Sequence, residues 1–127
     1  MTLNKFFIIS VIYLQAIMHG FSPKIIAAQV FVESSFNPAA VNGRSVGLMQ
    51  VNLSVWKKEL NIDESRMTEP FYNLNMGLKI LRIYLNKTGN IWDALFMYNN
   101  GYKHKNYKYV PKIKRTMIKL YGGTLWD

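Results

Sequence analysis

The sequence predicts a mainly α-helical protein that forms one compact domain over residues 1–127, with about five to six helices and little or no β-structure. Apolar residues recur at intervals of three and four along several segments, which is the period of a helix that buries one face. Helix start and stop signals separate these segments, and no convincing pair of strands is present. A chain of 127 residues, half of them hydrophobic, can bury a core without disulfides or metals.

The first two helices are predicted on either side of a short turn. Residues 3–19 are strongly apolar and form the first helix, which Gly20 ends. Ser22 is a favourable N-cap and Pro23 suits the first helical position. A second helix therefore follows through residues 24–34.

The middle of the chain is predicted to be a structured loop over residues 36–53. Short extended pieces are the most β-structure expected there. Ser54 is placed to cap a short helix that runs through Trp56 to Leu60, and residues 61–69 form another loop. The residues that break any regular period in the first loop are Asn37, Pro38, Asn42, Gly43 and Gly47.

Three further helices are predicted in the second half. Pro70 opens the first of them, and Gly89 ends it. Asn90 can cap the next helix, over residues 91–98, which Gly101 closes. A last helix spans about residues 110–120 and ends at Gly122-Gly123. The apolar positions of the helix that Pro70 opens are Leu74, Leu78, Leu81 and Leu85.

The chain is strongly basic, with 16 Lys and Arg residues against 7 Asp and Glu residues. This balance attracts polyanions such as nucleic acid, anionic lipid or acidic cell-wall polymers. Residues 103–119 hold seven basic residues and no acid, which is either a solvated helix face or a docking surface for anionic cell-wall polymers. We expect no nucleic-acid partner, because no nucleic-acid motif accompanies the charge. The basic residues are Lys103, Lys105, Lys108, Lys112, Lys114, Arg115 and Lys119.

The N-terminus has two interpretations. Lys5 precedes an apolar run from Phe6 to Leu14, as in a signal peptide. However, Gln15 and His19 interrupt the far end of the run, which is also too short for an ordinary transmembrane span. We therefore expect a retained core helix, and a cleaved signal or anchor remains the alternative.

Glu33 is the only carboxylate in the first 58 residues. It follows a nearly continuous apolar run and lies at the C-terminal end of its helix. The helix terminus carries partial negative charge and the apolar surroundings disfavour an ion, so both should raise the pKa of Glu33. A carboxyl group that is protonated near neutral pH is what a general acid needs. A solvent-facing glutamate at a frayed helix end is the alternative.

Several motifs follow Glu33 in order, and together they resemble the soluble lytic transglycosylase family, with its goose-type-lysozyme-like catalytic domain. The similarity covers roughly residues 8–120, almost the whole chain. One departure lies before Gly47, where Asn42 stands nearest the position of a serine that is common in the family. The motifs are Glu33-Ser34, Phe36-Asn37-Pro38, Gly47-Leu48-Met49-Gln50, then Glu69-Pro70 with Asn73 and Gly77, and finally Tyr98-Asn99-Asn100-Gly101.

The resemblance implies cleavage of the β-1,4 bond between N-acetylmuramic acid and N-acetylglucosamine in peptidoglycan. Glu33 would protonate the glycosidic oxygen and then, as a carboxylate, take the proton of the muramic acid C6 hydroxyl, which gives a 1,6-anhydro sugar. Tyr98 is expected to hydrogen-bond Glu33 or the substrate, and Glu69 to cap the helix that follows it. The expected substrate contacts are Ser34, Met49, Gln50, Asn52, Tyr98, Asn99 and Tyr109.

Two other functions remain open at this stage. Water would replace the C6 hydroxyl in a hydrolysing muramidase, and a cationic wall-binding module would keep the scaffold without turnover. We expect no cofactor and no metal, since there is no cysteine and His19 and His104 lie far apart. We also expect a monomer that acts in the cell envelope or outside the cell, and a phage-encoded origin would fit.

Overall fold

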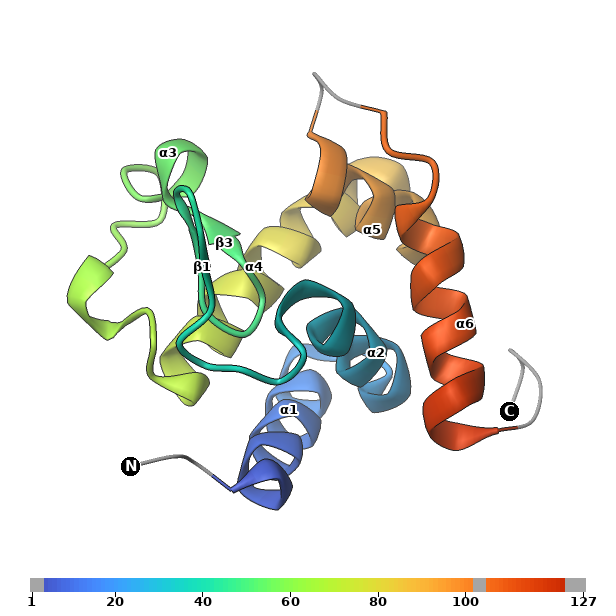
Figure 1. Cartoon of the computed structure of the whole chain (residues 1–127). Coiled ribbons are helices and arrows are strands. Elements are labelled where there is room, and N and C mark those ends of the chain that lie inside the picture. Colours follow the sequence, from blue (N-terminus) through green and yellow to red (C-terminus); the bar gives the residue numbers. More distant parts are fainter. Residues whose placement is uncertain (1–3, 102–104, 123–127) are drawn as a thin grey trace.

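The computed structural model describes residues 4–101 and 105–122, and this part of the chain is mainly helical, as predicted. Six α-helices surround one continuous hydrophobic core, and the β-structure is limited to three strands of two residues each (Figure 1). The elements are α1 Lys5–His19, α2 Pro23–Ser34, β1 Val41–Asn42, β2 Ser45–Val46, β3 Val51–Asn52, α3 Leu53–Trp56, the 3-10 helix η1 Glu64–Arg66, α4 Pro70–Thr88, α5 Ile91–Asn100 and α6 Tyr109–Tyr121.

Helix α1 packs into the core through one face. Ile12 and Ala16 are fully buried there, and α1 lies against α2 and α4. Gly20 ends the helix, as predicted, because it adopts a left-handed conformation with φ of 77°. One face of the apolar N-terminal segment is therefore part of the folded core, and its other face is exposed. Within the described residues, no helix is both long enough and apolar enough to span a membrane.

Helix α2 is the central element, and it lies against both α1 and α6 (Figure 1). Ser22 caps it as predicted, with its hydroxyl accepting a hydrogen bond from the Ile25 N–H at 3.4 Å. A run of five consecutive residues, 26–30, is buried, as expected for a helix covered on several sides. The helix ends when Ser35 turns into the left-handed region. The last turn of α2 therefore emerges from the core carrying Glu33.

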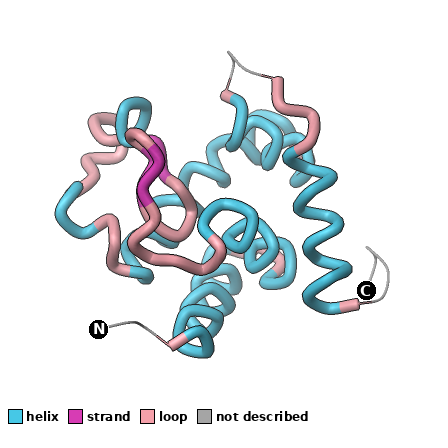
Figure 2. The backbone as a smooth tube through the Cα atoms, in the orientation of Figure 1, coloured by secondary structure: helices cyan, strands magenta, loops and turns pink. Residues whose placement is uncertain are grey.

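The loop after α2 forms a small antiparallel sheet in the order β1-β2-β3 (Figure 2). The Asn73 side chain on α4 fixes this sheet and its connecting loop through hydrogen bonds. Its Oδ1 accepts from the Met49 N–H at 2.8 Å, and its Nδ2 donates to the carbonyls of Val46 and Met67 at 2.9 Å. Gly47 is required beside this side chain, since a Cβ atom at residue 47 would lie 2.1 Å from Nδ2 of Asn73. One buried amide thus fixes the loop on the helical core.

Helix α3 is shorter and starts earlier than predicted. Asn52, and not Ser54, is its N-cap, because the Asn52 Oδ1 accepts from the Ser54 N–H at 3.0 Å. The helix ends at Trp56, where the prediction extended it to Leu60. The following loop contains η1, where the prediction placed only irregular loop.

The last three helices agree with most of their predicted boundaries. Helix α4 runs from Pro70 to a left-handed Gly89, and the Asn90 side chain caps α5 through two backbone N–H groups. Helix α5 continues two residues past the predicted end at 98. Helix α6 ends at Gly122, and Gly123 lies outside the described residues.

The capping role predicted for Glu69 is wrong. Glu69 occupies the N-cap position of α4, but its side chain makes no capping hydrogen bond. Its carboxylate instead pairs with the Arg66 guanidinium, at 3.2 Å from Nε. The short turn between η1 and α4 places this cation next to Glu69, so the carboxylate turns away from the helix N-terminus.

Candidate active site

Glu33 lies in the last turn of α2 and is half-buried. Its Oε2 accepts a hydrogen bond from the Tyr109 phenol at 2.6 Å. Burial raises the pKa of Glu33 to about 7, against the smaller lowering effects of the Tyr109 hydrogen bond and of the Lys112 charge. The prediction of a raised pKa is confirmed. Near neutral pH this carboxyl group exchanges readily between its acid and base forms, as general acid-base chemistry requires.

Tyr109 opens helix α6 and is 4% exposed. Burial, then the nearby Glu33 charge, raises the pKa of its phenol well above the usual range, so it stays a hydrogen-bond donor. Gln29 lies one helical turn before Glu33 on α2, is fully buried, and has the opposite, lowering effect on the pKa of the Tyr109 phenol. Glu33 and Gln29 lie four residues apart on α2, so both side chains lie on the face of α2 that is turned toward the Tyr109 phenol.

Tyr98 was expected to hydrogen-bond Glu33 or the substrate, and it does not bond to Glu33. Its phenol donates to the Met49 carbonyl at 2.7 Å and ties α5 to the loop between β2 and β3. Burial, and after it the Glu33 charge, raises the pKa of Tyr98 well above its usual range. Tyr98 is therefore close enough to Glu33 to sense its charge, while its hydrogen bond supports the loop.

A pocket of about 420 Å³ opens beside Glu33. Three residues predicted for the site line it: Glu33, Asn99 and Tyr109. The Asn99 side chain is exposed, and its Oδ1 accepts from the Asn106 amide at 3.4 Å. The complete lining is Val32, Glu33, Asn99, Asn106, Lys108, Tyr109, Lys112 and Arg115.

Five predicted contacts do not line this pocket: Ser34, Met49, Gln50, Asn52 and Tyr98. The Ser34 hydroxyl donates to the Val30 carbonyl at 3.0 Å, one turn back along its own helix. Met49 is fully buried in the core, and a Cβ atom at Gly77 would lie 2.4 Å from its sulfur. Asn52 caps α3.

Gln50 is occupied within its own loop. Its Nε2 donates to the carbonyls of Ala40 and Gly47 at 3.1 and 3.0 Å. Its Oε1 accepts from the Asn42 amide at 2.8 Å. Asn42, the residue that departs from the family pattern, therefore stabilises the loop through Gln50. The backbone of Gln50 is left-handed, with φ of 49°, and these three hydrogen bonds hold it there.

Sequence reasoning missed five residues of the pocket as site residues: Val32, Asn106, Lys108, Lys112 and Arg115. Three of them, Lys108, Lys112 and Arg115, are basic residues of segment 103–119, of which Lys103 lies outside the described residues. Their spacing of four and three residues places them on one helix face, which is a signal the sequence contains. It could not be used without knowing that this face of α6 turns toward Glu33.

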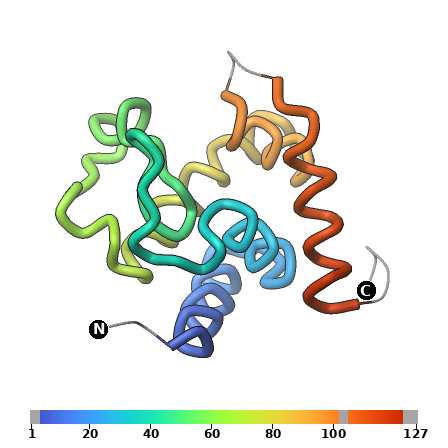
Figure 3. The backbone as a smooth tube through the Cα atoms, viewed as in Figure 1, coloured from blue at the N-terminus to red at the C-terminus, as the bar shows by residue number. Residues whose placement is uncertain are grey.

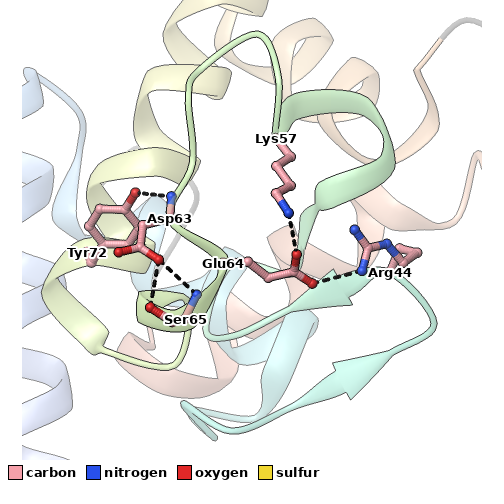
Figure 4. Close-up of polar contacts among 6 residues, drawn as sticks. All are labelled: Arg44, Lys57, Asp63, Glu64, Ser65 and Tyr72. Carbon is pink, nitrogen blue, oxygen red and sulfur yellow. Dashed lines mark hydrogen bonds and ion pairs between the residues drawn. The ribbon is translucent and has the colours of Figure 1, made fainter.

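No second carboxylate lines the pocket among the residues that the structure describes. Glu64 bridges Arg44 and Lys57, with oxygen–nitrogen distances of 2.9 and 2.7 Å (Figure 4). Asp63 caps η1 through Ser65, and its backbone N–H donates to the Tyr72 phenol (Figure 4). Hydrogen bonds, from Ser65 to Asp63 and from Lys57 and Arg44 to Glu64, lower the pKa of both acids. These carboxylates hold the loop before α4.

Comparison with known proteins assigns the chain to a family. The chain is 28% identical over 112 residues to a protein of Enterobacteria phage PRD1 named transglycosylase, and the match covers 84% of this chain. It spans 41% of the phage protein, so the chain corresponds to less than half of that relative's length. No solved structure matches the chain. The family model described as the transglycosylase SLT domain matches residues 11–116, and the chain therefore belongs to this family.

Proposed function

We propose that this protein is a peptidoglycan lytic transglycosylase in which Glu33 serves as acid and then as base. The observation that carries the proposal is the Glu33 carboxyl group itself. It has a pKa of about 7, lines the pocket, and is fixed by Tyr109. Family membership and the name of the phage relative support the same class of reaction.

The reaction takes two proton transfers at one carboxyl group. In the first, protonated Glu33 gives its proton to the glycosidic oxygen, and the bond between C1 of N-acetylmuramic acid and that oxygen breaks. In the second, the Glu33 carboxylate takes the proton of the muramic acid C6 hydroxyl while that oxygen bonds to C1. The products are a 1,6-anhydro end and a free C4 hydroxyl on N-acetylglucosamine, and Glu33 is protonated again.

The usual glycosidase scheme uses two carboxyl groups, one as acid and one as base or nucleophile. The pocket offers one among its described lining residues, which favours the intramolecular attack. Tyr109 suits both steps, because its hydroxyl stabilises the carboxylate and restrains its orientation. Hydrolysis remains the competing reaction, since a water molecule could take the place of the C6 hydroxyl.

The mass of the released muropeptides tests the proposal. Purified peptidoglycan is incubated with the wild type and with Glu33→Gln, which keeps the shape of the side chain and removes its titration. We expect the wild type to release anhydro ends, which are lighter than reducing ends by one water, and the variant to release none. Reducing ends alone would identify a muramidase. Activity that is unchanged in Glu33→Gln would assign catalysis to another group.

The proposal extends to the setting of the enzyme. We infer that residues 1–127 work as one domain and act on the cell wall as a monomer. The cations of segment 103–119, which contains no acid, would concentrate the protein on anionic wall polymers. A cationic module without turnover would share this binding, and the Glu33→Gln comparison separates the two.

A further inference from the structure

Three basic side chains form one wall of the pocket beside Glu33. Lys108, Lys112 and Arg115 all line it, and their spacing of four and three residues puts them on one face of α6. All three are exposed to solvent. Lys114 differs from them, because its ammonium lies 4.7 Å from the centre of the Trp92 ring. The three cations therefore face the pocket together, apart from the other basic residues of α6.

None of the ion pairs among the described residues involves this wall, and the one carboxyl group in the described lining of the pocket is Glu33. The ion pairs found among the described residues join Arg44 and Lys57 to Glu64, and Arg66 to Glu69, all outside α6. Like charges at these helical spacings repel one another and destabilise the helix. The first turn of α6 adds the positive end of its helix dipole at the same place. The pocket thus presents a concentrated positive potential that suits an anion.

The proposed substrate carries an anion at the required place. N-acetylmuramic acid differs from N-acetylglucosamine by a carboxyl-bearing lactyl group on C3, in the same ring as the C1 that is attacked. With C1 held at Glu33, a group on C3 falls within one sugar width of the pocket wall. The carboxylate is free in strands without stem peptides. In strands with stem peptides the lactyl carboxyl group forms an amide bond to the peptide, and the peptide's own carboxylates supply the negative charge.

We propose that Lys108, Lys112 and Arg115 bind the carboxylate carried by the C3 substituent of the muramic acid whose C1 bond is cleaved. This inference rests on the proposed function. It gives the pocket a reason to distinguish the two sugars of the strand. Guanidinium and ammonium groups both bind carboxylates through charge-assisted hydrogen bonds, and Arg115 can do so with two parallel bonds.

The test compares strands with and without free carboxylates. The four substrates are peptidoglycan strands with stem peptides, strands from which an amidase has removed them, and both kinds after carbodiimide amidation of their carboxylates. Lys108→Gln/Arg115→Gln is compared with the wild type, and Lys112 is left in place because its charge affects Glu33. The matched control is Lys58→Gln/Lys79→Gln, which removes two exposed charges outside α6 and outside the pocket.

We expect the pocket variant to raise KM about fivefold on carboxylate-bearing strands, with kcat changed by less than about twofold. On amidated strands its KM should equal that of the wild type, and the control pair should behave like the wild type throughout. A rise in KM confined to strands without stem peptides identifies the lactyl carboxylate as the bound group. A rise confined to stem-bearing strands identifies a carboxylate of the peptide as the bound group. An equal rise on native and amidated strands, or no rise on either, would overturn the inference.

Failure of the proposed function can be recognised separately. If the wild type releases no anhydro ends from any strand, the assigned reaction is wrong, whatever the charge dependence. Binding then decides the present inference, and Glu33→Gln protein is co-sedimented with native and amidated sacculi. We expect retention on native sacculi to fall several-fold when Lys108→Gln and Arg115→Gln are combined with Glu33→Gln in one protein. Equal retention on both kinds of sacculi would reject a carboxylate site.

Discussion

At the scale of single residues, Glu33 is held by a partner that lies 76 positions away in the sequence. The Tyr109 hydrogen bond favours the ionised carboxylate, and burial favours the neutral acid. Burial is the larger effect, so the pKa stays at about 7. The balance of these two influences sets the pH at which Glu33 can act as an acid.

Replacing Tyr109 with phenylalanine should therefore raise the pKa of Glu33 further. The substitution removes the 2.6 Å hydrogen bond and retains the buried ring. Because the first step needs protonated Glu33, the decline of kcat/KM at alkaline pH should move to higher pH. A pH profile of kcat/KM measures this shift. Tyr98→Phe is the control, because the Tyr98 phenol donates to the Met49 carbonyl and not to Glu33. In this variant the alkaline decline of kcat/KM should stay at the same pH as in the wild type. A shift to lower pH in Tyr109→Phe would contradict the assigned role.

Which tyrosine reaches Glu33 could not be predicted from the sequence. Tyr98 and Tyr109 are both near the end of the chain, and the choice between them depends on how α5 and α6 pack against α2. The local roles were easier to foresee, because they involve near neighbours. The Ser34 hydroxyl bonds four residues back along its own helix, as serine hydroxyls commonly do within helices.

At the scale of elements, the helices that were predicted best have strong local signals at their ends. Ser22 with Pro23, Gly89, and Asn90 act through residues within one turn, so their effects do not depend on the rest of the fold. Helix α3 was misplaced because Asn52 and Ser54 are both good caps. The Asn73 contacts that fix the preceding loop decide between them, and those contacts are not local.

The buried face of α1 should contribute much of the stability of the fold. Ile12 is fully buried, whereas Ile17 on the same helix is 64% exposed. Ile12→Ala should lower the free energy of unfolding by about 3 kcal/mol, since it leaves a cavity in the core. Ile17→Ala should change it by less than about 0.5 kcal/mol. Urea denaturation of both variants measures the difference. Equal effects would show that α1 does not pack on α2 and α4 in solution.

At the scale of the whole molecule, charge is distributed unevenly. Four of the acids lie between residues 59 and 69, and helix α6, which carries two of the pocket's cations and has the third at its N-cap position, lies on the other side of α2 from that segment (Figure 3). Composition predicted a cationic surface, but it could not place that surface beside Glu33. Packing of α6 on α2 brings the two together. The basic segment is thus part of the candidate active site as well as a surface for wall polymers.

The buried acid should also give the molecule a specific pH dependence of stability. Folding raises the pKa of Glu33 from 4.5 to about 7, so the folded state retains a proton that the unfolded chain releases between these values. The wild type therefore loses stability as pH rises through this window. Glu33→Gln cannot ionise and should escape this loss.

Relative to the wild type, Glu33→Gln should gain up to about 3 kcal/mol between pH 4 and pH 8, as the linkage between pKa and folding requires. Urea denaturation at several pH values measures the difference, and it should level off on either side of the window. Asn99→Ala is the control, because it alters the same pocket without removing a titrating group. Its difference from the wild type should not depend on pH. If the Glu33→Gln difference is equally constant, Glu33 ionises as easily in the folded protein as in the unfolded chain, and it is then a poor acid at neutral pH.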